Sequence, residues 1–212
     1  MTAVKICGLT NLDDARWAWQ CGADLLGFVF VRSSPRSVSQ AEVARMVRAL
    51  KDEACGARFV GVFADQSIEA VRRIARTCSL HLAQLHGGES PDYARALGVP
   101  VIVARRVRDR VPWDELSEYG AWAYLLDSYH PQQLGGTGHS WPWELLAKRP
   151  QDQTKIIIAG GLTPNNVALA IDQARPWGVD VSSGVEAHPG RKDPSKVELF
   201  VQRAKRHREA TP

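Results

Sequence analysis

Two residues of this sequence carry groups that can exchange protons, and each stands at the end of a short apolar segment. Cys7 closes the run Val4–Cys7, and Asp127 directly follows Tyr124-Leu125-Leu126. A thiolate can act as a general base and a carboxylic acid as a general acid. The alternatives are a small buried hydrophobe for Cys7 and a helix cap or loop carboxylate for Asp127. Because a carboxylate that ends an apolar inner strand is costly to bury, the positions favour an acid–base pair.

Lys5 stands two residues before Cys7, and an extended chain directs both side chains to the same face. A nearby ammonium group favours the thiolate over the thiol. His86 ends the segment Gln84-Leu85-His86, and we interpret it as a hydrogen-bonded structural histidine rather than a catalytic one. The sequence therefore predicts Lys5 as a neighbour of the candidate base.

Two glycine-containing segments follow the last two apolar runs of the chain. One is Ala159-Gly160-Gly161-Leu162, and the other is Ser182-Ser183-Gly184. Glycines allow backbone N–H groups to approach an anion closely. A Gly-Gly pair alone is equally typical of a tight turn. The two segments together predict a phosphate site formed by Gly160, Gly161, Ser183 and Gly184.

These candidates need a scaffold that brings them together, and short apolar runs rich in β-branched residues indicate one. The runs are Val4–Cys7, Leu25–Val31, Phe59–Phe63, Leu80–Leu85, Val99–Ala104, Ala121–Leu126, Lys155–Ala159 and Val179–Val181. Such runs are typical of parallel strands buried on both faces. Helix-start signals lie between them, namely Thr10 with Asp13, Ser39 with Glu42, Ser90-Pro91 and Thr163-Pro164.

Alternating strands and helices predict right-handed βαβ units, and eight of them predict a single (β/α)8 barrel over residues 1–212. A doubly wound open sheet is the alternative, but no Gly-x-Gly-x-x-Gly follows the first run. In a (β/α)8 barrel the functional groups lie at the carboxyl ends of the strands. The candidate residues therefore converge on one mouth of the predicted barrel.

Composition excludes several other classes of protein. No segment approaches the roughly 18–20 apolar residues of a membrane span, and the N-terminus lacks the pattern of a signal peptide, so we expect a cytoplasmic protein. None of the four cysteines forms a C-x-x-C pair or lies near a histidine at zinc-ligand spacing, which argues against a metal site. The net charge of +4 is mild, and no nucleic-acid-binding pattern accompanies it.

The same residues carry a family resemblance that spans almost the whole chain. The matching motifs are Lys5-Ile6-Cys7-Gly8-Leu9-Thr10, Gly27-Phe28-Val29-Phe30, Ser34-Pro35-Arg36, Gln84-Leu85-His86-Gly87, Leu126-Asp127-Ser128, Gly135-Gly136-Thr137-Gly138, Ala159-Gly160-Gly161-Leu162 and Asp180-Val181-Ser182-Ser183-Gly184-Val185-Glu186. In these motifs the chain resembles the phosphoribosylanthranilate isomerases. It departs from them at Ser128 and around Trp143. The resemblance therefore does not predict the conformation of the loop after the sixth strand.

The resemblance implies an Amadori rearrangement of a phosphosugar substrate in tryptophan biosynthesis, without metal or organic cofactor. It implies that Asp127 is the general acid and Cys7 the general base. Gly160, Gly161, Ser183 and Gly184 would hold the phosphate. Arg36 would pair with the anthranilate carboxylate. The Arg105–Arg110 cluster either steers the anionic substrate or is a solvated basic loop.

Two alternatives stay open at this point. A histidine-pathway sugar isomerase performs the same reaction, but that family uses two aspartates, and Cys7 argues against it. A barrel that only binds phosphosugar or RNA is the rival from another class, supported only by the basic charge. Neither a monomer nor a homodimer is favoured by the sequence.

Overall fold

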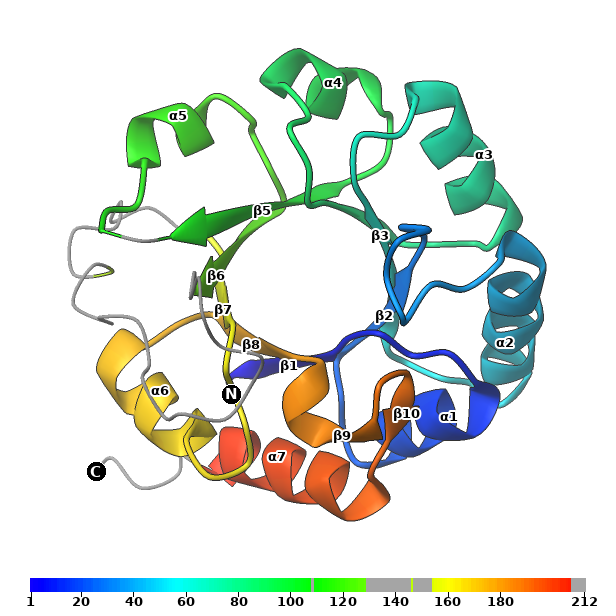
Figure 1. Ribbon diagram of the computed structural model, residues 1–212, viewed down its shortest axis with the longest axis vertical. Helices are drawn as coiled ribbons and strands as arrows, with labels where there is room; N and C mark the ends of the chain where they lie inside the picture. Colours follow the sequence, from blue (N-terminus) through cyan, green and yellow to red (C-terminus); the bar gives the residue numbers. More distant parts are fainter. Residues whose placement is uncertain (108, 129–145, 147–153, 207–212) are drawn as a thin grey trace.

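The computed structural model describes residues 1–107, 109–128, 146 and 154–206. Eight parallel strands close into a barrel in chain order, with β8 beside β1 (Figure 1). The strands are β1 (Ala3–Ile6), β2 (Leu25–Val29), β3 (Arg58–Phe63), β4 (Leu82–Leu85), β5 (Val101–Val107), β6 (Ala123–Ser128), β7 (Ile156–Ala159) and β8 (Gly178–Val181). The closed barrel confirms the predicted fold class, whereas the domain limits at residues 1 and 212 stay a prediction.

Helices surround the barrel in Figure 1. They are α1 (Leu12–Gln20), α2 (Gln40–Asp52), α3 (Ile68–Thr77), α4 (Pro91–Ala96), α5 (Trp113–Ser117), α6 (Val167–Ala174) and α7 (Pro194–Arg206). A short 3-10 helix, η2 (Ser183–Val185), follows β8, and the small hairpin of β9 (Glu186–His188) and β10 (Arg191–Lys192) leads to α7. Helix α2 buries Val43, Met46, Val47 and Leu50, as its apolar spacing predicts.

Two of the four helix-start predictions are confirmed and two are wrong. Ser39 forms a capping box with Glu42, and Ser90 caps α4 with proline in the first turn. Asn11, not Thr10, caps α1, because the Thr10 hydroxyl instead donates to the carbonyl of Gly190. After β7, residues 163–166 form a turn, so Thr163-Pro164 does not open α6; Asn166 precedes its first residue.

The barrel interior changes from apolar to polar along its axis. Side chains from β2 to β7 meet in one apolar cluster that includes Leu25, Val60, Leu82, Leu125 and Ile157. Side chains of a parallel strand alternate between its two faces, so the next inward positions belong to a different layer. There Cys7 packs with Val29 and Val62. Polar groups inside the barrel therefore lie toward the carboxyl ends of the strands.

Most of the connection between β6 and β7 lies outside the described residues. The loop after the sixth strand, whose conformation the family resemblance does not predict, falls in this part of the chain, and so does Trp143. Within the ranges that the structure describes, no helix is long and apolar enough to cross a membrane.

Candidate active site

Cys7 lies immediately after β1, and its side chain faces the barrel interior. Its backbone N–H donates to the carbonyl of Val181 on β8 (2.9 Å), and the residue is 7% exposed. A Cβ atom built at Gly27 on β2 would lie 2.9 Å from Cys7 Sγ and 3.1 Å from Lys5 Nζ. Because Gly27 has no side chain, the thiol and the ammonium group have room to lie side by side above it. Lys5 and Cys7 thus share one face of the strand, as the alternation of side chains along the first strand predicts.

Lys5 is fully buried, and its Nζ lies 2.8 Å from Oδ1 of Asp180 on β8. A buried ammonium group needs such a partner, because the desolvation of an isolated charge is very costly. Burial raises the pKa of the Cys7 thiol, and the positive charges of Lys5 and Lys192 oppose this rise. The thiol therefore lies in a dry environment in which nearby cations favour its ionised form.

Asp127 lies near the end of β6, and burial together with the charge of Asp180 raises its pKa to about 6. The positive charge of Arg106 acts in the opposite direction. His86 Nε2 is 3.8 Å from Asp127 Oδ2, too far for a hydrogen bond. A carboxyl group with this pKa keeps an appreciable protonated fraction near neutral pH, as a general acid requires.

His86 makes the hydrogen bond that a structural histidine would make, but it lies beside the candidate acid. Gln84 Nε2 is 3.2 Å from His86 Nδ1. Burial lowers the pKa of the His86 ring, which therefore stays neutral at physiological pH. Arg105 turns aside from the mouth, since its guanidinium lies over the ring of Tyr119 at 5.0 Å. Of the two neighbouring arginines, Arg106 is the one that acts on Asp127.

The two glycine loops predicted to hold phosphate are in direct contact. Gly160 and Gly161 both have positive φ (87° and 63°), a conformation that other residues rarely adopt. A Cβ at Gly184 would lie 1.9 Å from the carbonyl oxygen of Leu162, so only glycine fits there. Open space surrounds the Cβ position of Gly161. The loops after β7 and β8 therefore form one surface with room beside Gly161.

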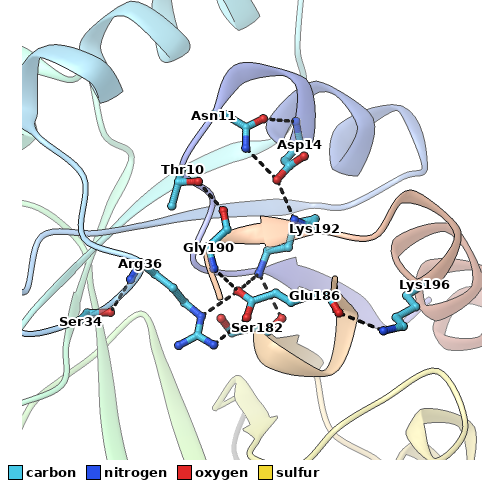
Figure 2. A network of polar contacts seen from close by, with 10 residues as sticks. All are labelled: Thr10, Asn11, Asp14, Ser34, Arg36, Ser182, Glu186, Gly190, Lys192 and Lys196. Carbon is cyan, nitrogen blue, oxygen red and sulfur yellow. Dashed lines mark hydrogen bonds and ion pairs between the residues drawn. The ribbon is translucent and has the colours of Figure 1, made fainter. Parts of the chain in front are cut away.

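The side chain of Arg36 points toward Glu186, in the segment that follows β8 (Figure 2). Its Nε and Nη2 donate to Oε1 and Oε2 of Glu186 at 2.8 and 2.7 Å. Its stem crosses Gly8, where a Cβ would lie 2.6 Å from Arg36 Cδ. Lys192 Nζ binds the same carboxylate at 3.0 Å and the carbonyl of Ser182 at 3.1 Å.

Several buried polar residues of this mouth were not singled out from the sequence. They are Asp180, Gln84, Glu186 and Lys192. Strand alternation could have indicated Asp180, two residues before Ser182, and Gln84, two residues before His86. Nothing local could have indicated the contact of Arg36 with Glu186, because 150 positions separate the two residues. No group of three metal-ligating side chains occurs in the described part of the chain.

The ionisable groups inside the barrel gather at the carboxyl ends of the strands, where (β/α)8 barrels hold their active sites. Fold and position together define a (β/α)8-barrel enzyme. The family described as N-(5′-phosphoribosyl)anthranilate (PRA) isomerase matches residues 4–203. The N-(5′-phosphoribosyl)anthranilate isomerase of Trichlorobacter lovleyi is 46% identical over 205 residues, 97% of this chain and 98% of the relative. The chain thus belongs to the N-(5′-phosphoribosyl)anthranilate isomerase family, a family of isomerases of tryptophan biosynthesis.

Solved structures agree with this assignment. The crystal structure of phosphoribosyl anthranilate isomerase from Thermotoga maritima is similar with a TM-score of 0.87 and 36% identity, covering 97% of this chain and 99% of that one. A second isomerase structure contains reduced 1-(o-carboxyphenylamino)-1-deoxyribulose 5-phosphate; it has a TM-score of 0.82 and 34% identity over 97% of this chain and 99% of that one.

Proposed function

We propose that this protein converts N-(5′-phosphoribosyl)anthranilate to 1-(2-carboxyphenylamino)-1-deoxyribulose 5-phosphate, with Asp127 as general acid and Cys7 as general base. The observation that carries this proposal is the pairing of two unlike groups in one buried mouth. Asp127 has a pKa raised to about 6 by burial and by the charge of Asp180. Cys7 lies beside the Lys5 ammonium group at Gly27.

The reaction needs one proton donor and one proton acceptor. Asp127 protonates the ring oxygen of the ribose, and the C1′–O bond breaks to give an iminium ion. Cys7 then removes the proton from C2′, and the electrons of that C–H bond form the enolamine. Tautomerisation of the enolamine gives the ketone. The iminium nitrogen accepts the electron pair, so the proposed route uses neither a metal nor an organic cofactor.

Two anchors hold the substrate by its charged ends. Gly160, Gly161, Ser183 and Gly184 bind the phosphate, which the open space at Gly161 and the contact between the two loops support. Arg36 binds the aromatic carboxylate. The ligand in the similar isomerase structure has the same two ends, a carboxyphenyl group and a 5-phosphate. We expect a phosphosugar, and neither nucleic acid nor membrane, as the partner of a cytoplasmic monomer or homodimer.

Turnover by the purified protein tests this function. The fluorescence of the anthranilate group changes as the rearranged product forms, whereas a protein that only binds shows no change beyond saturation. Cys7→Ala and Asp127→Asn should each lower kcat by about 10²–10⁴-fold with little change in product affinity. Near-normal turnover by either variant, with the fold intact by circular dichroism, would show that the roles are assigned wrongly.

The histidine-pathway sugar isomerase remains the second candidate, because it performs the same rearrangement on another aminosugar phosphate. Arg36 separates the two, since only the tryptophan-pathway substrate carries an anthranilate carboxylate. Parallel assays of the purified protein with both substrates compare their kcat/KM values directly. A preference for the histidine-pathway substrate would overturn the proposal.

A further inference from the structure

We propose that Glu186 is the positioning residue of the carboxylate site: it holds one edge of the Arg36 guanidinium so that the other edge faces the aromatic carboxylate. This inference rests on the proposed function, since it assumes that Arg36 binds that carboxylate. Its basis is the network drawn in Figure 2, in which one buried carboxylate contacts both Arg36 and Lys192.

The geometry of the pair leaves one face of the guanidinium for a ligand. Arg36 uses Nε and one N–H of Nη2 to bind the two oxygens of Glu186. A guanidinium has five N–H donors in a planar fork. Nη1 makes no hydrogen bond to any residue that the structure describes. The N–H groups at the Nη1–Nη2 end of the fork can therefore donate to a second carboxylate in the same plane.

Glu186 can act as a fixed support because it is itself immobilised. The residue is 7% exposed, and Lys192 Nζ lies 3.0 Å from its Oε1. Its backbone carbonyl accepts from Lys196 Nζ at 2.9 Å. The charges of Arg36 and Lys192 outweigh the effect of burial and lower the pKa of Glu186. The support is thus ionised as well as rigid.

The charges of the network match one substrate carboxylate. Arg36 and Lys192 are cationic and Glu186 is anionic, which leaves one positive charge. Without the Glu186 charge, two cations would face each other across a buried site, and the guanidinium would turn away from Lys192. Burial already lowers the pKa of Lys192 against the pull of Glu186. Glu186 therefore keeps both cations in place for a single incoming anion.

Glu186 also links the two anchors of the substrate. It directly follows η2, which contains Ser183 and Gly184 of the proposed phosphate site. Arg36 is therefore joined through one side chain to the loop that holds the phosphate. This arrangement sets the spacing between the two anions of a ligand, so selectivity for ligands with both charges should depend on Glu186.

The test compares two inert ligands by calorimetry: the reduced product and its counterpart without the carboxylate. In Glu186→Gln we expect the preference for the carboxylate ligand to fall about tenfold, as for a lost charge-assisted contact. The affinity of the counterpart should stay unchanged. In steady-state assays KM should rise about tenfold and kcat should change less than about threefold.

Two comparisons separate positioning from a merely structural role. In the Arg36→Met background, Glu186→Gln should cause no further loss of carboxylate preference, because it acts through Arg36. Glu53→Gln is the matched control, since Glu53 binds Nε and Nη2 of Arg16 with the same geometry on the surface. This control should leave both ligands unaffected. A full carboxylate preference in Glu186→Gln, or additive losses with Arg36→Met, would overturn the inference.

Folding and function are controlled separately. If Glu186→Gln does not fold, Glu186→Gln with Lys192→Met removes both buried charges together, and its carboxylate preference decides the question in the same way. Absence of turnover by the native protein would overturn the proposed function. The ligand comparison is an equilibrium measurement and would still decide the role of Glu186.

Discussion

Lys5 Nζ lies 2.8 Å from Asp180 Oδ1 inside the barrel, and this pair places opposite charges near the two proposed catalytic groups. The ammonium end meets the thiol of Cys7 in the space above Gly27. The carboxylate end contributes to the raised pKa of Asp127. Within one buried ion pair, the Lys5 charge therefore opposes the rise that burial causes in the pKa of Cys7, and the Asp180 charge adds to the rise in the pKa of Asp127.

Lys5→Met should raise the pKa of Cys7 further, because burial would then act with less opposition from nearby cations. We expect kcat to fall by about 10–100-fold through loss of thiolate. Ultraviolet absorbance of the thiolate, with Cys7→Ala as the blank, measures the titration. Lys205→Met, which breaks the pair with Asp24 (2.6 Å), is the control. An unchanged titration of Cys7 would show that Lys5 does not act on the thiol.

Gly27→Ala should impair catalysis although it adds only a methyl group. The new Cβ would lie 2.9 Å from Cys7 Sγ and 3.1 Å from Lys5 Nζ, so the thiol and ammonium must separate. We expect at least about a tenfold loss of kcat and a destabilisation of about 1–3 kcal/mol from overpacking. Gly56→Ala, where nothing lies within 4 Å of the new atom, should be neutral in both assays. Equal behaviour of the two variants would contradict this account.

The pH profile of kcat/KM should rise through about 6, the pKa of Asp127. Below it both groups are protonated, and thiolate is lost tenfold per pH unit. Between the pKa of Asp127 and that of Cys7, the fraction of Cys7 thiolate rises with pH as fast as the fraction of protonated Asp127 falls. The profile therefore stays level in this range. The profile falls above the pKa of Cys7, which burial raises above the ordinary value of a thiol against the charges of Lys5 and Lys192. The apparent values belong to the pair.

A control is needed because a substrate phosphate also titrates near pH 6. Asp180→Asn removes a charge that raises the pKa of Asp127, so the acidic limb should move to lower pH. Arg106→Met removes a charge that lowers it, so the limb should move to higher pH. His86 lies close to Asp127, and the same two charges shift its pKa in the same directions, so both variants are also measured in a His86→Gln background. A limb that neither variant moves belongs to the substrate.

Asp127→Asn should lose most of its activity yet be more stable than the native protein at pH 8. The pKa of Asp127 rises from 3.8 to about 6 on folding, so the folded state loses stability as pH rises through this range. At about 1.4 kcal/mol per unit this amounts to about 1–3 kcal/mol, which asparagine avoids. Denaturant unfolding at pH 8 and pH 5 measures the difference, which should shrink at pH 5. A stability gain independent of pH would have another cause.

Gly161→Asp should abolish thermal protection by inorganic phosphate. The substitution adds a like charge in the open space where the anion is proposed to bind. Gly98→Asp is the matched control, because Gly98 also has positive φ (75° against 63°) and empty surroundings, but it lies between α4 and β5, at the opposite end of the barrel. Phosphate should still protect this control. Equal protection of both variants would place the phosphate elsewhere.

Much of the scaffold could be predicted because its determinants are local. Continuous apolar runs indicate buried parallel strands, and the capping box of Ser39 with Glu42 needs only neighbours three residues apart. The Thr10 prediction failed for the opposite reason. Its hydroxyl donates a hydrogen bond to the carbonyl of Gly190, 180 positions away, and Asn11 is the N-cap of α1. A local rule fails where a distant group competes for the same side chain.

The sequence by itself determined the barrel, the family, and the positions of Cys7 and Asp127 at strand ends, since strand periodicity and short motifs carry that information. Only the tertiary structure decided the electrostatics of the mouth. Lys5 and Asp180 are 175 positions apart, and Arg36 and Glu186 are 150 apart. Pairing of β1 with β8 closes the barrel and brings residues from the two ends of the chain into contact. In that interior the charges interact strongly, because they are close together and the dielectric constant is low. The spacing of these residues along the chain does not indicate such contacts.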